Sequence, residues 1–245
     1  MRLSKLIVLL LCISLIFLPL TTSNAETLYQ QNFEANDSDV FVIAATNATC
    51  ATDSGWASSG TYSLKFNITT EGGTATAVRD WGNSGFSTMY MRFDIYVTSG
   101  LTATMADTDY FWLVGADDED FESTFYMKIQ DDSGTDQLFI QWGGGQDSTV
   151  ITLFSTDTKH TVVLYHETDA SAGIVQIWVD GVLEINRSSL NTGAKAPQYF
   201  YWGVNASSSV TGAYYIDDIV IDSSNYIGTG HRIQEGVAVG SLPYF

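Results

Sequence analysis

Apolar and polar residues alternate along most of this chain. The clearest case is residues 88–98, where methionine, phenylalanine, isoleucine and valine alternate with Tyr90, Arg92, Asp94 and Tyr96. A period of two places one set of side chains in a core and the other set on a solvent-facing side, as in a strand of an antiparallel sheet. Residues 88–98 are therefore predicted to form a half-buried strand.

Short runs with the same character recur, separated by clusters of glycine, aspartate, serine and asparagine. No run keeps the period of an amphipathic helix, so the pattern predicts an all-β sandwich. Asp180-Gly181 lies between two such runs and predicts a tight hairpin, because both residues tolerate positive φ. The other predicted strands cover residues 28–33, 62–68, 75–79, 110–114, 124–130, 137–142, 149–154, 160–166, 174–179, 199–204 and 214–221.

The N-terminus has the order of a secretory signal peptide. Arg2 and Lys5 precede an apolar stretch over residues 6–20, and Ser23-Asn24-Ala25 fits a small-x-small cleavage site. The apolar stretch is too short for a permanent membrane span. We expect a signal peptide at residues 1–25, one domain at 26–225 and a tail at 226–245, in a secreted or cell-surface protein without membrane insertion.

The chain is strongly acidic, with a formal net charge of −18 at pH 7. Loss of Arg2 and Lys5 with the signal peptide would make the remainder more negative still. Such a charge opposes binding to nucleic acid or to an anionic membrane. Cys50 is the one cysteine after the cleavage site, so no disulfide can form within these residues and stability must come from the core.

Four short motifs give the chain a family resemblance. They are QNFE at 31–34, GTYSLKF at 60–66, WVDG at 178–181 and AYYIDDIVIDS at 213–223. With these motifs and its strand rhythm, the chain resembles the concanavalin A-like superfamily of laminin-G-like modules, legume-type lectins, carbohydrate-binding modules and polysaccharide-degrading enzymes. The resemblance implies an all-β fold, a two-sheet antiparallel jelly-roll sandwich, and a glycan or polysaccharide as partner.

The resemblance also implies a structural calcium ion. In carbohydrate-binding modules of this type, an N-terminal F-E motif and a C-terminal Y-I-D-D-V motif often lie on adjacent strands, and their acidic residues hold the ion. The matching residues here are Glu34, Asp217 and Asp218. Hard carboxylate and carbonyl oxygens suit Ca²⁺, which tolerates flexible geometry. The alternative is that one aspartate faces solvent and the other bonds loop amides.

An acidic run provides an enzymatic alternative. Asp118, Asp120 and Glu122 have the i, i+2, i+4 spacing with which glucanases of this superfamily aim three carboxylates from one strand into a groove. The triplet departs from the Glu-x-Asp-x-Glu of those enzymes, and Glu119 interrupts the expected apolar alternation. A glycoside hydrolase is therefore an alternative to a binding protein, and a solvated loop is another interpretation of this run.

Polysaccharide lyases on the same scaffold give a second enzymatic alternative. They use arginine, glutamine, histidine and tyrosine to neutralise a uronate and move a proton. Arg92 with Tyr90, together with Gln141 and His166, could be arranged in this way. The lyase motifs are absent, and cations are scarce for an anionic polymer. A simpler interpretation makes Arg92 an ion-pair partner of Asp94 or of a neighbouring residue.

Aromatic and polar side chains on the solvent-facing sides of the predicted strands favour ligand binding. If the strands are neighbours, these side chains form one concave surface on which sugar rings stack while polar groups bond hydroxyls. The predicted function is a lectin-like module that binds a glycan without catalysis; an enzyme, or a structural or adhesive surface protein, is the alternative. The predicted ligand-binding residues are Tyr90, Arg92, Asp94, Tyr96, Tyr126, Lys128, Gln130, Gln141 and Tyr201, with Trp112, Trp142, Trp178 and Trp202 as further stacking candidates.

Overall fold

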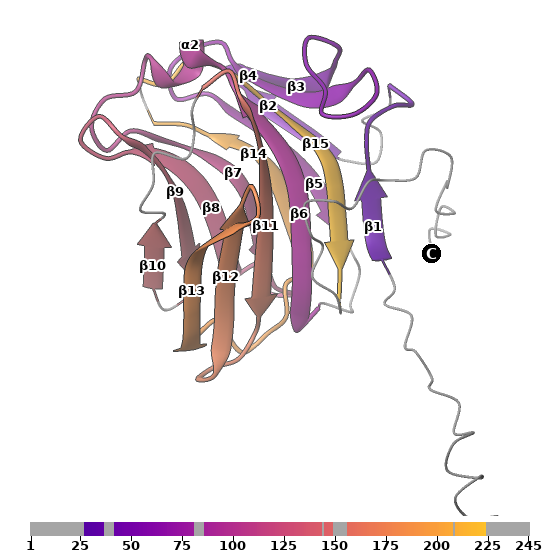
Figure 1. Cartoon of the computed structure of the whole chain (residues 1–245), viewed down its shortest axis with the longest axis vertical. Coiled ribbons are helices and arrows are strands. Elements are labelled where there is room, and N and C mark those ends of the chain that lie inside the picture. The colour runs from indigo at the N-terminus through magenta and orange to yellow at the C-terminus, as the bar shows by residue number, and fades with distance from the viewer. Residues whose placement is uncertain are drawn as a thin grey trace, which may run out of the picture.

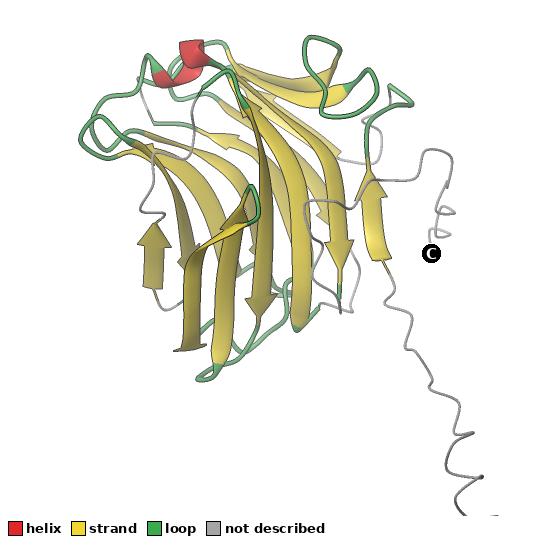
Figure 2. Cartoon of the chain, in the orientation of Figure 1, coloured by secondary structure: helices red, strands yellow, loops and turns green. Residues whose placement is uncertain are grey.

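A computed structural model describes residues 27–36, 42–80, 86–143, 145–148, 156–207 and 209–223. In these ranges the chain forms two antiparallel sheets packed face to face (Figure 1 and Figure 2). One short helix, α2 (Ser99–Thr102), lies at one end of the sandwich. The predicted all-β, two-sheet jelly-roll sandwich of the concanavalin A-like type is confirmed. No helix within the described ranges is long and apolar enough to cross a membrane.

The first sheet, called the β6 sheet, is centred on the strand that shows the clearest alternation. Its order is β13-β12-β11-β6-β15-β4-β3, and β1 pairs with β15 beside β4. The two motifs QNFE and YYIDD are thereby brought together. The bounds are β1 (Thr27–Gln31), β3 (Ala48–Asp53), β4 (Ser63–Ile68), β6 (Thr88–Val97), β11 (Lys159–Glu167), β12 (Gly173–Val179), β13 (Val182–Leu190) and β15 (Gly212–Asp222).

The second sheet, called the β8 sheet, lies behind the first in Figure 1. Its order is β10-β9-β8-β7-β14-β5-β2. The bounds are β2 (Val42–Thr46), β5 (Thr74–Asp80), β7 (Tyr110–Asp117), β8 (Ser123–Asp131), β9 (Asp136–Trp142), β10 (Gly145–Ser148) and β14 (Tyr199–Asn205).

Most of the predicted strands are present, with ends that differ by a few residues. The hydrophobic pattern does not predict β2, β3 or β10, because β2 and β3 are rich in alanine and threonine and β10 is the polar sequence GQDS. The predicted signal peptide at 1–25, the strand at 149–154 and the tail at 226–245 lie outside the described residues.

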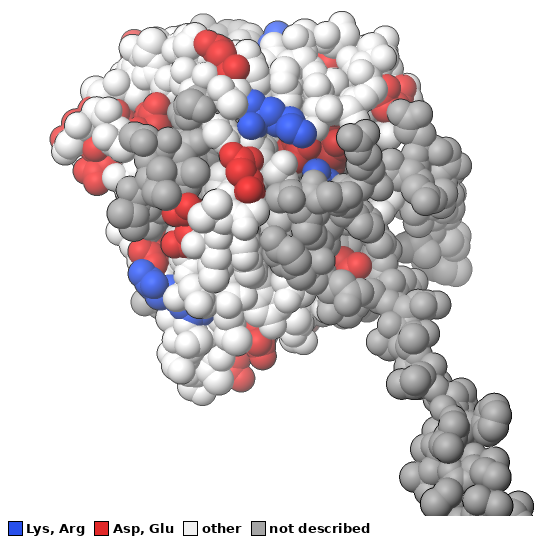
Figure 3. Space-filling model, viewed as in Figure 1, with Lys and Arg blue, Asp and Glu red and all other residues white. Residues whose placement is uncertain are grey.

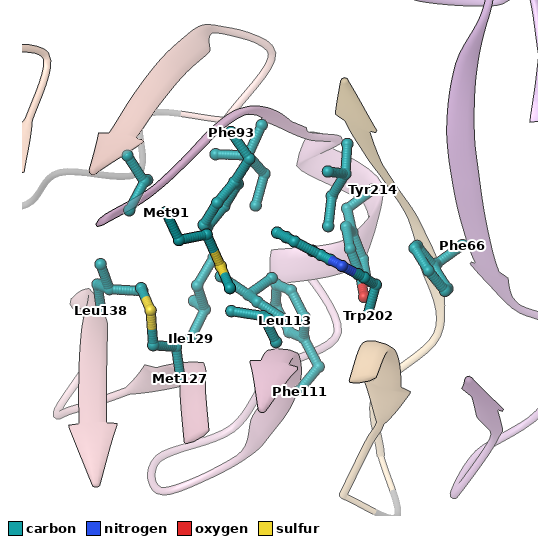
Figure 4. Packing of buried hydrophobic residues seen from close by; sticks show 14 of the residues in the cluster. Phe66, Met91, Phe93, Phe111, Leu113, Met127, Ile129, Leu138, Trp202 and Tyr214 are labelled. Carbon is teal, nitrogen blue, oxygen red and sulfur yellow. The ribbon is translucent and has the colours of Figure 1, made fainter. Parts of the chain in front are cut away.

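The core fills the space between the two sheets. Met91 and Phe93 of β6 lie close to Leu113 and Met127 of the β8 sheet, and Phe93 meets Trp202 edge to face with ring centroids 5.2 Å apart (Figure 4). All five side chains are almost fully buried. Trp202 is therefore a core residue and not a ligand-stacking surface, and the sandwich is stabilised by interdigitating apolar side chains.

Two local features also agree with the sequence. Asp180 and Gly181 join β12 to β13 with φ of 50° and 84°, the two positive values that suit a tight hairpin turn. Cys50 is buried in β3, and burial raises the pKa of its thiol to about 12. It therefore serves as a small packing side chain rather than as a reactive thiol.

Candidate functional site

The predicted ligand-binding residues divide between opposite faces of the sandwich. Those of β6 lie on the outer face of the β6 sheet, because the residues between them, Met89, Met91 and Phe93, are in the core. Those of β8, β9 and β14 lie on the outer face of the β8 sheet. The expected single concave surface is therefore not formed. The first group is Tyr90, Arg92, Asp94 and Tyr96; the second is Tyr126, Lys128, Gln130, Gln141 and Tyr201.

The group on the β6 sheet is also largely covered. Arg92 is 4% exposed and Asp94 is fully buried, so the expectation of a wet side is wrong at these two positions. Arg92 Nη2 lies 3.2 Å from Asp94 Oδ1, which confirms the ion pair, and Lys159 Nζ lies 3.2 Å from Asp94 Oδ2. The hydroxyl of Ser58, from the segment after β3, also donates to Asp94. This polar network fixes a loop to the sheet rather than facing a ligand.

The lyase arrangement is not formed either. Tyr90 packs against Tyr165 with ring centroids 4.6 Å apart on the outer face of the β6 sheet. His166 points the other way, into the core against Phe125, and is fully buried. Gln141 lies on the β8 sheet. The four groups therefore do not converge on one groove. Figure 3 views the molecule from the side of the β6 sheet, where acidic side chains lie at several separate places and basic ones at few.

The three predicted calcium ligands contact one loop. Glu34 Oε1 accepts the backbone N–H groups of Thr61 at 2.8 Å and Tyr62 at 2.9 Å. Asp218 Oδ1 accepts the hydroxyl of Ser59 at 2.7 Å. Gly60 has φ of 63°, and a Cβ at this position would collide with the Glu34 carboxylate. The loop thus passes over Glu34 at a distance that only glycine permits.

Asp217 has a different environment from its neighbour. Its Oδ2 accepts the backbone N–H groups of Ser58 at 2.8 Å and Ser59 at 3.2 Å. Burial, and then the nearby Asp218 carboxylate, raise the pKa of Asp217 to about 7. Among the described residues, no three His, Cys, Asp or Glu side chains converge as a metal-binding group. Glu34 and Asp218 contact the same loop, so they are the carboxylates that a cation at this loop would use.

The outer face of the β8 sheet carries a hollow of about 390 Å³. Its floor is open where two strands have glycine, Gly115 in β7 and Gly203 in β14. A Cβ at Gly203 would collide with the backbone oxygen of Ala75, whereas a Cβ at Gly115 would meet Tyr126 Cβ at 3.3 Å. The residues that line the hollow come from β5, β7, β8 and β14 and include Thr74, Thr76, Trp112, Asp117, Tyr126, Tyr201 and Asn205.

Aromatic rings form the walls of this hollow. Trp112 and Tyr126 stack with centroids 4.5 Å apart and planes at 9°. Strand register places Gly115 between Tyr126 and Tyr201, so the two tyrosines flank the open floor. The Tyr126 hydroxyl donates to Gln141 Oε1 on β9, which extends the polar edge of the wall. Burial raises the pKa of Tyr126, so its hydroxyl stays protonated at neutral pH.

Two more predicted residues continue the wall along β8. Lys128 Nζ lies 4.9 Å from the ring centroid of Tyr110 and 5.4 Å from that of Phe139. Burial lowers the pKa of Lys128, because its ammonium group has fewer waters around it. Gln130 is next on the same side and pairs with Tyr110 of β7 in the strand register. All five predicted residues of this second group therefore share one face.

The acidic triplet forms a turn rather than a strand. β7 ends at Asp117 and β8 begins at Ser123, and Asp118 Oδ1 accepts the backbone N–H groups of Asp120 at 2.9 Å and Glu122 at 3.0 Å. Strand alternation does not aim the three carboxylates, so the expected catalytic spacing is wrong. Asp118, Asp120 and Glu122 nevertheless line a second pocket of about 490 Å³, which shares Ser123 with the hollow.

Some of the site could not be found from periodicity. Trp112 was identifiable as a stacking candidate, but its contact with Tyr126 depends on pairing between β7 and β8. Glycine inside a strand signals a close approach or an open surface, and this signal is present at Gly115 and Gly203. These two glycines line the hollow, and the strand pattern missed them.

Comparison with known proteins gives matches in fold alone. No family model matches the chain, and no curated protein matches it. Among solved structures, "Cellulose induced protein, Cip1" is similar with a TM-score of 0.59 and 16% identity, over 80% of this chain and 97% of that chain.

Two other solved structures extend this likeness. A carbohydrate esterase from the Shiga toxin-encoding bacteriophage phi24B has a TM-score of 0.58 and 14% identity, over 82% of this chain and all of that chain. Alginate lyase vAL-1 from Chlorella virus has a TM-score of 0.52 and 9% identity, over 81% of this chain and all of that chain. At these identities the likeness establishes a shared fold.

Proposed function

We propose that the protein binds a glycan or polysaccharide in the hollow of the β8 sheet without cleaving it. The observation that carries the proposal is the stacked pair of Trp112 and Tyr126 beside the glycine floor. The apolar face of a sugar ring stacks on an aromatic surface, while nearby polar groups bond its hydroxyls. Gln141 and Lys128 lie beside the aromatic wall and supply such groups.

The structural neighbours support a carbohydrate partner. The matched proteins are described as cellulose-induced, as a carbohydrate esterase and as an alginate lyase. A shared fold does not by itself assign a substrate. The choice of this face over the opposite one rests on the hollow and its aromatic walls, because the outer face of the β6 sheet is covered at Arg92 and Asp94.

Binding without cleavage is favoured by the roles of the nearby carboxylates. A glycosidase places two carboxyl groups on either side of the scissile bond. Here the Asp118 carboxylate bonds the backbone of its own turn, and Asp120 forms an ion pair with Lys195. These contacts hold the turn in place.

A glycoside hydrolase is the second candidate function. The observation that favours it is the pocket lined by Asp118, Asp120 and Glu122 directly beside the hollow. A polymer lying in the hollow would pass close to these carboxylates. Product formation separates this candidate from simple binding.

We further propose that the protein acts outside the cell and binds a structural calcium ion. The signal-like N-terminus supports secretion. Glu34 and Asp218 support the calcium site, since they contact neighbouring residues of one loop and use Oε1 and Oδ1, respectively, in those bonds. Asp217 shapes the loop by bonding its amides. When bound, the ion would neutralise these carboxylates and hold the loop against the sheet.

The test is a glycan-array screen of the protein with and without calcium, run beside assays for reducing ends and unsaturated products on each ligand found. Ligand binding without either product would support the proposal. Release of reducing ends would instead identify a hydrolase, and unsaturated products a lyase. An array with no binding in either condition would contradict glycan binding and favour a structural or adhesive surface protein.

A further inference from the structure

An exposed aromatic platform lies at the end of the hollow. Phe121, in the turn between β7 and β8, is 65% exposed, more than any other large apolar side chain in the described ranges. Its ring stacks on Tyr199 with centroids 4.5 Å apart and planes at 15°. A single exposed apolar side chain is common on protein surfaces, but here the Phe121 ring stacked on Tyr199 forms an aromatic surface that is open to solvent.

The turn holds Phe121 in a strained conformation. Phe121 has φ of 62°, which costs a residue with a side chain free energy. The conformation is fixed by hydrogen bonds from Phe121 N to Asp118 O at 3.1 Å and from Asp118 N to Glu122 O at 2.9 Å. Lys195 also ties the turn to the segment before β14, with Nζ 3.0 Å from Glu119 Oε1. The surrounding contacts thus maintain an arrangement that presents the ring to solvent.

The platform is aligned with the floor of the hollow. Phe200 and Trp202 point into the core, so Tyr199, Tyr201 and Gly203 all lie on the outer face of β14. Alternate residues of a strand are about 6.6 Å apart, so these three positions span about 13 Å. This length is greater than one sugar ring can cover. The hollow and the second pocket also share Ser123, which makes the two spaces neighbours.

The charges beside the platform select against a polyanion. Asp117, Asp120 and Glu122 line the two spaces. Lys195 is already paired with Glu119 and Asp120, so its charge is compensated. Lys128 lies farther along β8 and is a single positive charge, so an anionic polymer following this path would meet more carboxylates than cations.

We infer that Phe121 and Tyr199 form a second sugar-stacking subsite, so that the site takes an internal stretch of an uncharged polysaccharide rather than one terminal sugar. The inference rests on the proposed glycan binding at Trp112 and Tyr126. It adds a length requirement and a charge preference to that proposal. The path runs from the glycine floor along β14 and ends over the β7–β8 turn.

The experiment titrates the full chain with uncharged oligosaccharides of cellulose, xylan and mannan, from disaccharide to hexasaccharide, and with alginate oligosaccharides of the same lengths. We expect affinity for uncharged chains to rise with length. Phe121→Ala should remove that rise, a loss of about tenfold or more for the hexasaccharide, while disaccharide binding is kept. Phe121→Trp should retain the rise. Leu183→Ala, at an apolar position 44% exposed on the β6 sheet, is the matched control and should change nothing.

Three outcomes would overturn the inference. The first is that Phe121→Ala binds the hexasaccharide as tightly as the wild type does, while disaccharide binding is lost in Trp112→Ala. The second subsite would then be wrong, and the proposed glycan binding at Trp112 would stand. If alginate oligosaccharides bind more tightly than uncharged ones, the charge preference is wrong. If no oligosaccharide binds, this inference and the proposed function fail together. Thermal melts of both alanine variants check that the fold is kept.

Discussion

Trp112 of β7 and Tyr126 of β8 stack with their ring planes only 9° apart. The two residues are not direct partners in the strand register, where Trp112 faces Lys128 and Tyr126 faces Gly115. The contact is therefore diagonal, across the position that glycine leaves open. Packing between the rings fixes a wall of the hollow, which would reduce the entropy cost of the proposed glycan binding.

Loss of this wall should weaken binding more than it weakens folding. We predict that Trp112→Ala lowers the affinity for a bound glycan by about 1–3 kcal/mol, with base stacking on aromatic side chains as the guide. Tyr165→Ala is the matched control, because Tyr165 is a half-buried tyrosine on the opposite outer face. Titration calorimetry on both variants measures the effect. Equal affinities for Trp112→Ala and the wild type would place the ligand elsewhere.

Gly115 tests the floor of the hollow. A methyl group there would contact Tyr126 Cβ at 3.3 Å and Phe125 O at 3.4 Å, so Gly115→Ala fits with small adjustments. We expect stability to change by less than about 1 kcal/mol, since alanine also reduces the entropy of the unfolded chain. Affinity should fall by about tenfold or more, because the methyl group occupies ligand space. Gly100→Ala in α2, where a Cβ meets nothing within 4 Å, should leave affinity unchanged and raise stability by about 0.4–1 kcal/mol.

The alternation of side chains predicted which side of each strand is buried, but not to which sheet the strand belongs. Tyr90 and Tyr126 both occupy polar positions of alternating strands, and a period of two treats them alike. Pairing places β6 beside β11 and β15, and β8 beside β7 and β9. These are long-range contacts. The predicted single surface is therefore wrong in its continuity, because its residues divide between the two sheets.

The carboxylates show a second limit of sequence spacing. The i, i+2, i+4 spacing of the acidic triplet points the three carboxylates to one side only if the backbone is extended. The φ of 62° at Phe121 shows that the backbone turns within the triplet. Likewise, burial of Asp94 depends on Ser58, which lies 36 residues away along the chain. Strand periodicity contains no information about which loop folds over a strand. The motif resemblance did better, because it predicted that the QNFE and YYIDD motifs lie on adjacent strands, and β1 does pair with β15.

Asp217 should make stability depend on pH when calcium is absent. Its pKa is raised from 3.8 to about 7, so between these pH values the folded state holds a proton that the unfolded state releases. Stability from this group is therefore present at low pH and is lost as pH rises toward 7. In a chelator, Asp217→Asn should remove this loss, which is on the order of a few kcal/mol. Urea unfolding across this range, for both proteins, measures the difference. If the free energies of unfolding of the wild type and Asp217→Asn change with pH in parallel, the prediction is contradicted.

His166 should act in the opposite direction. Burial lowers its pKa from 6.5 to about 4, and its Nε2 has no hydrogen-bond partner in the described structure. The unfolded state therefore binds the additional proton between these pH values, and stability from this group is lost as pH falls. His166→Leu should remove a loss on the order of 3 kcal/mol near pH 4 and leave stability at pH 7 equal or higher. The measurement is the free energy of unfolding of both proteins between pH 7 and pH 4. If it falls with pH as steeply in His166→Leu as in the wild type, this role is ruled out.

Calcium should raise the melting temperature through Glu34 and Asp218. Binding to the native state alone stabilises it by about 2.7 kcal/mol when calcium is at a hundred times its Kd. Glu34→Ala should remove most of the calcium-dependent rise. It should also lower the melting temperature without calcium, because the N–H groups of Thr61 and Tyr62 lose their acceptor.

The informative quantity is therefore the difference between the melting temperatures in calcium and in chelator. Glu71→Ala, at an exposed turn position, is the control and should keep the full difference. A wild-type melt that calcium and chelator leave unchanged, after thorough removal of bound metal, would exclude a stabilising calcium site at this loop.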